Sequence, residues 1–490
     1  MINQNMNRKI ILHSFAWKML ERAVTLGSGL AVQIILARIL MPQDFGSLAI
    51  LVAVINYASV FVQGGLSAAV VQKKELDKTD ISTLMILSQG IALIFYILLY
   101  MLAPVISRYY GLPILVSALR VMSLMLFLQA YNAVQTALYI RDMQFQKIFL
   151  RSVIAGPVSG AIGILLAWRG FGLWSLVIYQ LCNTGLLVMM MWIDLKYRPG
   201  FAFSWKKAKA IYSFSGKILC SNLVSGLGDT IRTMAIGKTY TSAQLAYYDK
   251  AYTYSLYSVQ IINASAGGVL LPVFSAKQEA QSAIKAMARR SVSLLAYFVF
   301  PVLAGIAASA ESLVKVLLTE KWLPCVPYLM IFCVLRAFGT AVITDKQVYT
   351  ALGRSDILLY FEIGSLALNL MFLCFSIRIG LMAAAAGAVF AEFFASLILV
   401  FVSSRLYGYS IRERFEDLIH PLAGSAVLFA AVYAAGSLPV QEWIKLGLQG
   451  CIGVTVYAVC SIAGKDKNFT YVCAVLKKKN LHKQQEAFYD

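Results

Sequence analysis

Charge is scarce in this sequence. Only 13% of its 490 residues are charged and 60% are hydrophobic, against about 25% charged and about 45–50% apolar in an ordinary soluble domain. This balance argues against a soluble fold. Apolar stretches of about 20 residues, the length that a membrane-spanning helix needs, recur instead from one end to the other. The composition predicts a protein that is almost entirely embedded in a membrane.

Histidines and closely spaced cysteines are also lacking. The three histidines, His13, His420 and His482, lie at or beyond the edges of the apolar stretches, which argues against a histidine proton relay within the bilayer. The eight cysteines never take a CxxC spacing, so neither a metal site nor a redox pair is indicated. No cofactor and no metal are expected.

Acidic residues are few beside basic ones. The sequence has 43 lysines and arginines against 23 acidic residues, a formal net charge of +20. In a soluble protein this excess would suggest a nucleic-acid partner, but between apolar spans it is typical of basic cytoplasmic loops. We expect no nucleic-acid partner.

The apolar stretches predict an all-α integral membrane protein with about fourteen transmembrane helices. Charges, glycines and prolines separate them into the ranges 11–38, 44–66, 81–104, 113–137, 148–168, 172–193, 211–236, 249–272, 291–317, 325–349, 356–377, 380–402, 418–436 and 443–463.

Basic residues in the short loops predict the orientation of these spans. With the N-terminus inside, most loop lysines and arginines fall on the cytoplasmic side, so both termini are expected there. The first apolar run is interrupted by charges and has no cleavage site, so we interpret it as a retained span. Short loops leave no room for a soluble catalytic domain.

An internal repeat predicts two pseudo-symmetric lobes of six helices. Residues 14–29 and 213–228 share six identities at one constant offset, and six spans precede the second copy, so both copies begin with the same orientation. The expected organisation is an N-lobe at 1–193, a basic cytoplasmic linker at 194–210, a C-lobe at 211–402, two further helices at 403–464 and a basic cytoplasmic tail at 465–490. Substrate is expected between the lobes.

Several short sequence segments resemble those of one known family. They are ARILMPQDFGSLAI (37–50), GLSAAVVQKKELDKTDISTL (65–84), GFGLWSLVIYQ (170–180) and YRPGFAFSW (197–205), followed by YYDKAYTYSLYSVQ (247–260), LLPVFSAKQ (270–278) and EKWLPCVPYLMIF (320–332). The chain resembles the Wzx-type polysaccharide flippases of the multidrug/oligosaccharidyl-lipid/polysaccharide exporter superfamily, especially the colanic acid and teichuronic acid exporter branch. The last two spans and the tail resemble nothing particular.

The resemblance implies a transporter of the bacterial cytoplasmic membrane rather than an enzyme. Its expected cargo is an undecaprenyl-diphosphate-linked oligosaccharide repeat unit, moved by alternating access for surface polysaccharide biosynthesis. Its expected partners are membrane lipids, a polysaccharide polymerase and a chain-length protein, and the expected state is a monomer. Two alternatives remain: a multidrug or cation antiporter of the same superfamily, and a membrane polysaccharide polymerase or ligase.

Basic residues within the spans are candidates for binding the diphosphate, because a charge in the bilayer is costly unless it has a function or reaches the interface. Lys18 and Arg22 follow one polar stripe of the first helix, and Lys217 and Arg232 follow a similar stripe in the second copy of the repeat. Arginine and lysine are the usual donors to phosphate. The cavity candidates are Lys18, Arg22, Arg120, Lys217, Arg232 and Arg336.

Two of these residues also have a structural interpretation. Lys18 can extend to the cytoplasmic interface, and Arg232 can pair with Asp229 three residues earlier. The acidic candidates for ion coupling are Asp229, Asp345, Glu362 and Glu392. Among these, Asp345 is expected to pair with the adjacent Lys346, and Glu392 can serve a helix contact instead.

The candidate charges favour an anionic ligand over a cationic drug, since most of them are basic. No paired carboxylates, nucleophile triad or metal cluster stands out to support a polymerase or ligase. A GxxxG pattern at Gly156 and Gly160 predicts close helix packing in the span 148–168, with a moving hinge as the alternative interpretation.

Overall fold

The computed structural model describes residues 2–63, 70, 77–194, 202–276, 281–464, 466–471 and 473–474, with a few side chains inside the helices left out. Within these residues every regular element is a helix. Thirteen segments are helical, long and apolar enough to cross a membrane. The predicted class, an all-α integral membrane protein, is confirmed.

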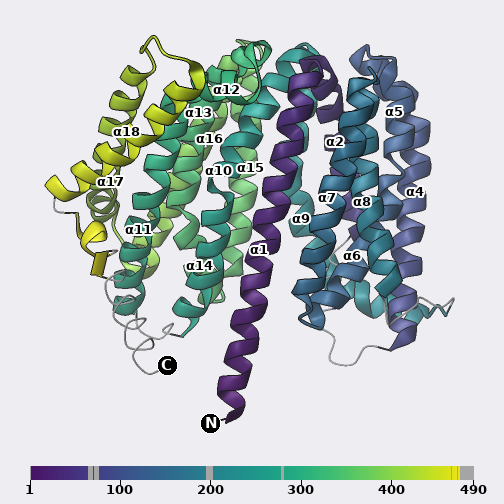
Figure 1. The fold of residues 1–490 in the computed structure, drawn as a ribbon. Coiled ribbons are helices and arrows are strands. Elements are labelled where there is room, and N and C mark those ends of the chain that lie inside the picture. The colour runs from purple at the N-terminus through teal and green to yellow at the C-terminus, as the bar shows by residue number, and fades with distance from the viewer. Residues whose placement is uncertain are drawn as a thin grey trace, which may run out of the picture. The chain divides into compact units, whose positions relative to one another are not determined.

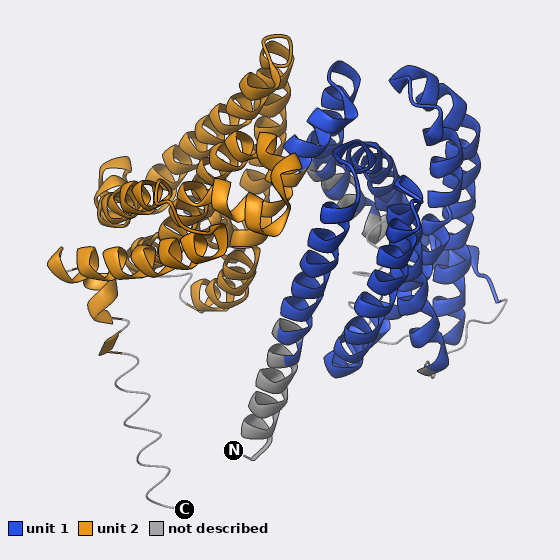
Figure 2. Cartoon of the chain, turned by 45° about the horizontal axis from the view of Figure 1, so that its top comes forward, with its two compact units in different colours: residues 1–249 blue, residues 250–490 orange. Residues whose placement is uncertain are grey.

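The chain forms two compact units, residues 1–249 and 250–490 (Figure 2). This division follows packing, whereas the lobes expected from the sequence follow the internal repeat, so the lobe boundaries stay a prediction. The helices of unit 1, labelled in Figure 1, are α1 (Ile2–Ile39), α2 (Pro42–Gln63), α4 (Lys78–Tyr110), α5 (Ile114–Met122), α6 (Met125–Arg141), α7 (Phe145–Trp168), α8 (Leu173–Asp194), α9 (Trp205–Thr239) and the start of α10 (Ser242–Ser275).

Unit 2 contains the rest of α10 and all later elements. They are α11 (Gln281–Ala308), α12 (Ala310–Leu317), the 3-10 helix η1 (Glu320–Cys325), α13 (Val326–Ala341), α14 (Ile343–Ala351), α15 (Ser355–Ser376), α16 (Leu381–Tyr407), α17 (Ile411–Ala435) and α18 (Glu442–Ala463). Two of the thirteen spans are built from joined pieces: α5 with α6, and η1 with α13 and α14.

The predicted span 211–236 lies inside α9, which is the most charged of the long helices. At 35 residues α9 is long enough to cross a bilayer of about 30 Å, but it is not among the thirteen apolar segments. Its sequence includes Lys217, Asp229, Arg232 and Lys238.

Small residues bring α1 close to α7. A side chain added at Gly160 would overlap Val32, and one at Gly156 would come within 3.1 Å of the Ser28 hydroxyl. Close backbone approach through small residues is a common way for membrane helices to pack, since burial from water cannot drive them together. The close packing predicted from the GxxxG pattern is confirmed.

Two of the family-like segments, 37–50 and 170–180, meet at one turn of unit 1. Asp44, at the start of α2, accepts a hydrogen bond from the Met41 backbone N–H at 3.3 Å. The same carboxylate lies beside Gly172, where an added Cβ would be 3.2 Å from it and where φ is 51°. Gly46, two residues further along α2, leaves no room for a side chain against the backbone of Ser242. The residues of these segments therefore form helix starts and allow close packing between helices.

Unit 2 has its largest described apolar cluster where α11, α14, α15 and α16 meet. Its buried members include Val292, Val348, Phe361 and Leu399. A smaller cluster joins Ala308 of α11 to Leu428 and Val432 of α17. These clusters fix the helices that position the charged residues described next.

Candidate functional site

The basic stripe of α1 is described only in part. Arg22 is exposed, and one turn further on the Thr25 hydroxyl donates a hydrogen bond of 3.2 Å to Glu21. The side chains of Lys18 and Lys217 lie outside the described residues. The pair of opposed basic stripes therefore stays a prediction.

Arg232 is paired within its own helix. Its Nη2 atom lies 2.8 Å from Oδ1 of Asp229, three residues earlier in α9, and the Arg232 side chain is 13% exposed while that of Asp229 is 62% exposed. This is the internal pair that the sequence offered as the alternative to substrate contact. Since a guanidinium has five N–H donors, one such pair still leaves it able to bind a further anion.

Arg120 stacks on an aromatic ring. Its guanidinium carbon lies 4.1 Å from the centre of the Tyr100 ring of α4, and Tyr96, one turn earlier, packs on Phe127 with ring centres 5.4 Å apart. The Arg120 Nε atom is buried and has no hydrogen-bond partner among the described residues. A buried donor without a partner is costly.

Arg336 of α13 is held against α10. Its guanidinium lies 4.2 Å from the centre of the Tyr252 ring. Nη2 donates to the Tyr252 carbonyl at 3.3 Å, and Nε lies 3.4 Å from the Ser255 hydroxyl. Stacking and donation together fix the plane of the guanidinium, which favours recognition of an anion in one orientation.

A group of charges from neighbouring helices lies inside unit 2. Lys346 of α14 pairs with Glu362 of α15 at 3.0 Å, and Glu392 of α16 interacts electrostatically with Lys346, Arg336 and Glu362. Glu362 and Glu392, both proposed from the sequence for ion coupling, thus share one charged neighbourhood with a candidate for substrate binding.

Asp345 does not pair with Lys346, contrary to the expectation from the sequence. Its two carboxylate oxygens each accept a hydrogen bond of 2.8 Å from Arg414 of α17, and the Asp345 side chain is fully buried. Adjacent residues in a helix point in different directions, which is why Lys346 turns to α15 instead. Ser403 and Tyr407 of α16 also donate to Asp345.

The polar network continues from Arg414 to the start of α11. Tyr409 packs beneath Arg414, with 4.5 Å between the guanidinium carbon and the ring centre, and donates to Asp417 at 2.9 Å. Burial raises the pKa of the Tyr409 hydroxyl although the charge of Arg414 opposes it, so Tyr409 stays a donor. Asp417 in turn accepts two hydrogen bonds from Arg289, of 2.8 and 2.9 Å.

Sequence reasoning missed three buried cations, which are Arg151, Lys250 and Arg414. Arg151 of α7 donates to the Tyr139 hydroxyl at 2.6 Å and is 5% exposed. Lys250 of α10 is 6% exposed, with its amine 5.7 Å from the centre of the Tyr254 ring. Arg151 and Lys250 lie just inside predicted spans, and Arg414 lies before the predicted span 418–436, because α17 begins at Ile411. From sequence alone, a charge near the uncertain end of a predicted span cannot be distinguished from a charge at the membrane interface.

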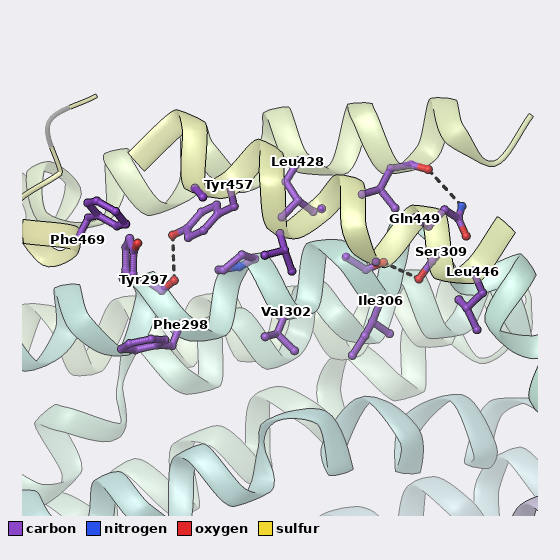
Figure 3. Close-up of a pocket in the computed structure, with 17 residues that line it drawn as sticks. Tyr297, Phe298, Val302, Ile306, Ser309, Leu428, Leu446, Gln449, Tyr457 and Phe469 are labelled. Carbon is purple, nitrogen blue, oxygen red and sulfur yellow. Dashed lines mark hydrogen bonds between the residues drawn. The ribbon is translucent and has the colours of Figure 1, made fainter. Parts of the chain in front are cut away.

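An apolar groove lies apart from these charges, between α11, α17 and α18 (Figure 3). It has a volume of about 500 Å³ and is lined by residues that include Val302 and Ile306 of α11, Leu428 of α17 and Val454 of α18. Phe469, beyond the end of α18, also lines it.

Comparison with known proteins places these features in a family context. A family model described as polysaccharide biosynthesis protein matches residues 35–327. The chain is 24% identical to the succinoglycan biosynthesis transport protein ExoT of Rhizobium meliloti (strain 1021), over 73% of this chain and 72% of ExoT. It is also 24% identical to the teichuronic acid biosynthesis protein TuaB of Bacillus subtilis (strain 168), over 82% of this chain and 84% of TuaB.

Among solved structures, the chain is similar to the lipid II flippase MurJ in its inward closed conformation. The TM-score is 0.76 at 15% identity, and the match covers 92% of this chain and 99% of that structure. At this identity the likeness establishes a shared fold of membrane helices.

Proposed function

Because this chain belongs to the polysaccharide biosynthesis protein family, we propose that it is a flippase for undecaprenyl-diphosphate-linked oligosaccharide repeat units. It moves them across the bacterial cytoplasmic membrane for a surface polysaccharide, which is an O-antigen, a capsule or an exopolysaccharide. The observation that carries this proposal is the family match over more than half of the chain. The transport and biosynthesis names of ExoT and TuaB support it.

The proposed transport relies on basic side chains that bind the diphosphate. Arg120 and Arg336 support this role, since each is held by an aromatic ring on a neighbouring helix. Arg22 and Arg232 complete the proposed set, with Lys18 and Lys217. The diphosphate and sugars enter a cationic central cavity from the cytoplasm, while the prenyl tail stays in lipid. Alternating access then presents the head group to the opposite face.

The electrical gradient favours this direction of transport. An inside-negative potential drives negative charge outward, which is favourable by about 2.3 kcal/mol per charge per 100 mV. A counter-ion bound by Glu362 or Glu392 would offset part of that energy and couple transport to an ion gradient. No covalent bond is made or broken, so the protein acts as a transporter and not as a polymerase or ligase.

The proposed setting is the inner membrane with both termini in the cytoplasm, as the distribution of basic loop residues predicts. The protein works as a monomer beside a polysaccharide polymerase and a chain-length protein. A multidrug exporter would need carboxylates exposed to its cationic cargo. Two of the candidate carboxylates, Asp345 and Glu362, are instead paired with Arg414 and Lys346, which favours the flippase.

The experiment that tests this function is leaflet-resolved transport of a fluorescent undecaprenyl-diphosphate oligosaccharide in proteoliposomes. Wild type is compared with the double variant Arg22→Ala and Arg232→Ala. The matched control is Arg378→Ala, which removes an exposed arginine from a loop between α15 and α16.

We expect wild type and the control to transport the substrate at equal rates, and the double variant to lose at least about tenfold in rate. Unchanged lipid chemistry during transport distinguishes a flippase from an enzyme. Transport by the double variant at the wild-type rate would exclude these arginines from the cavity. Failure of correctly inserted wild-type protein to transport any lipid-linked oligosaccharide would refute the proposed function.

A further inference from the structure

The groove between α11, α17 and α18 has an apolar surface although several of its side chains are polar. The Tyr457 hydroxyl donates to the Tyr297 carbonyl at 2.9 Å, and the amide nitrogen of Gln449 donates to the Val432 carbonyl at 3.2 Å. Ser309 likewise donates to the Gly305 carbonyl at 2.7 Å (Figure 3). With these donors bound to backbone carbonyls, the groove offers an occupant mainly carbon surface, which suits a hydrocarbon chain.

The size of the groove limits how much hydrocarbon it can hold. If each heavy atom takes about 30 Å³, as a water molecule does in liquid, 500 Å³ accommodates about 17 carbon atoms. From Tyr297 to Ser309 the groove follows α11 for about 18 Å at 1.5 Å per residue. Both values match one acyl chain of a phospholipid, with about 16 to 18 carbons, whereas an undecaprenyl chain of about 55 carbons would extend well beyond the groove.

One end of the groove has basic residues beside it. The segment 466–471 packs on the start of α11, since the Asn468 amide donates to the Ser293 hydroxyl at 2.8 Å and Arg290 stacks on Tyr471 at 3.9 Å. Phe469, from the same segment, lines the groove. Lys467 lies one helical turn before Tyr471, and both Lys467 and Arg290 are exposed.

We propose that this groove binds one acyl chain of an anionic phospholipid, whose headgroup phosphate is held by Arg290 and Lys467. A basic residue at a membrane surface attracts anionic lipid, and a hydrocarbon groove beside it adds the selectivity of a fitted chain. The bound lipid fills the space between α11 and α18 and so connects these two helices of unit 2. This inference does not depend on the proposed transport activity.

Native mass spectrometry of the purified, detergent-solubilised protein tests the site, with dioleoyl-phosphatidylglycerol and dioleoyl-phosphatidylcholine as probes. Gly450→Phe fills the groove, because Gly450 lines it and an added Cβ there meets open space. Gly447→Phe is the matched control, since this glycine lies on the same helix with equal room but outside the groove. Val302→Trp blocks the groove from α11, and the double variant Arg290→Gln with Lys467→Gln removes the headgroup contacts.

We expect wild type and Gly447→Phe to retain one phosphatidylglycerol at least about tenfold more tightly than Gly450→Phe or Val302→Trp, at unchanged thermal stability without lipid. The double charge variant should bind both probes equally. Equal phosphatidylglycerol binding by wild type and both groove variants would overturn the proposal. Equal binding of the two probes by wild type would also overturn it.

Discussion

Val32 of α1 occupies the space that a side chain at Gly160 of α7 would need. Gly160→Val should therefore push α1 away from α7 and destabilise the protein by about 1–3 kcal/mol, the usual effect of overpacking. The measurement is the thermal unfolding midpoint of the detergent-solubilised protein, followed by tryptophan fluorescence. Gly90→Val is the control, since an added side chain there meets open space on α4.

Shortening the partner residue should reverse this effect. In the double variant Val32→Ala with Gly160→Val, the removed methyl groups make room for the new ones, so we expect most of the lost stability to return. If the double variant is no more stable than Gly160→Val alone, the contact with Val32 is not what limits this position.

Loss of either partner of the buried pair between Asp345 and Arg414 should destabilise the protein strongly. Asp345→Ala leaves a cation that is 5% exposed without its carboxylate, and breaking a buried pair in this way costs about 3–5 kcal/mol. The unfolding midpoint should fall well below that of Asp356→Ala, which breaks an exposed pair with Arg354. Replacing both partners, as Asp345→Leu with Arg414→Leu, should recover stability, and failure to do so would assign the effect to lost packing.

The stacked arginines should matter to transport more than to folding. We expect Arg120→Ala and Arg336→Ala each to lower the flipping rate by about tenfold, because each removes a charged donor to phosphate. Lysine at either position should restore part of the rate, since it keeps the charge but not the planar fork. Arg405→Ala is the matched control, because Arg405 also stacks on an aromatic ring, Phe401, but near the end of α16. Equal rates in all of these variants would rule out the proposed roles.

Ion coupling should depend on Glu392. In proteoliposomes with an imposed proton or sodium gradient, Glu392→Gln should transport at a rate that no longer responds to the gradient, because the amide cannot exchange a cation. Glu311→Gln should respond as wild type does, since Glu311 is an exposed residue paired with Lys315 on α12. A full gradient response in Glu392→Gln would move the coupling role to another residue.

The helical membrane fold could be predicted because it depends on properties that sum along the chain. Apolar length and the positions of charges, glycines and prolines located most spans, and α18 begins one residue from its predicted start. The close contact at Gly160 could also be predicted from the sequence, since small residues at a spacing of four can lie on one helix face.

Side-chain partners could not be predicted in the same way, because they depend on which helices meet. Asp345 was expected to pair with its neighbour Lys346, and only the packing of α17 against the rest of unit 2 shows that Arg414 is its partner. Arg414 also lay outside its predicted span, so it was not counted among the intramembrane charges. The pair of Asp229 and Arg232 was predictable because both lie on one helix.

The ion pair between Asp345 and Arg414 can form only late in synthesis of the chain. Asp345 emerges from the ribosome 69 residues before Arg414, so α14 enters the membrane while its carboxylate still lacks its counter-charge. Its partner Arg414 becomes available only when α17 has been made. Helix α17 is thus a late checkpoint of biogenesis, and a chain that stops after α16 should be recognised by membrane quality-control proteases as unfinished.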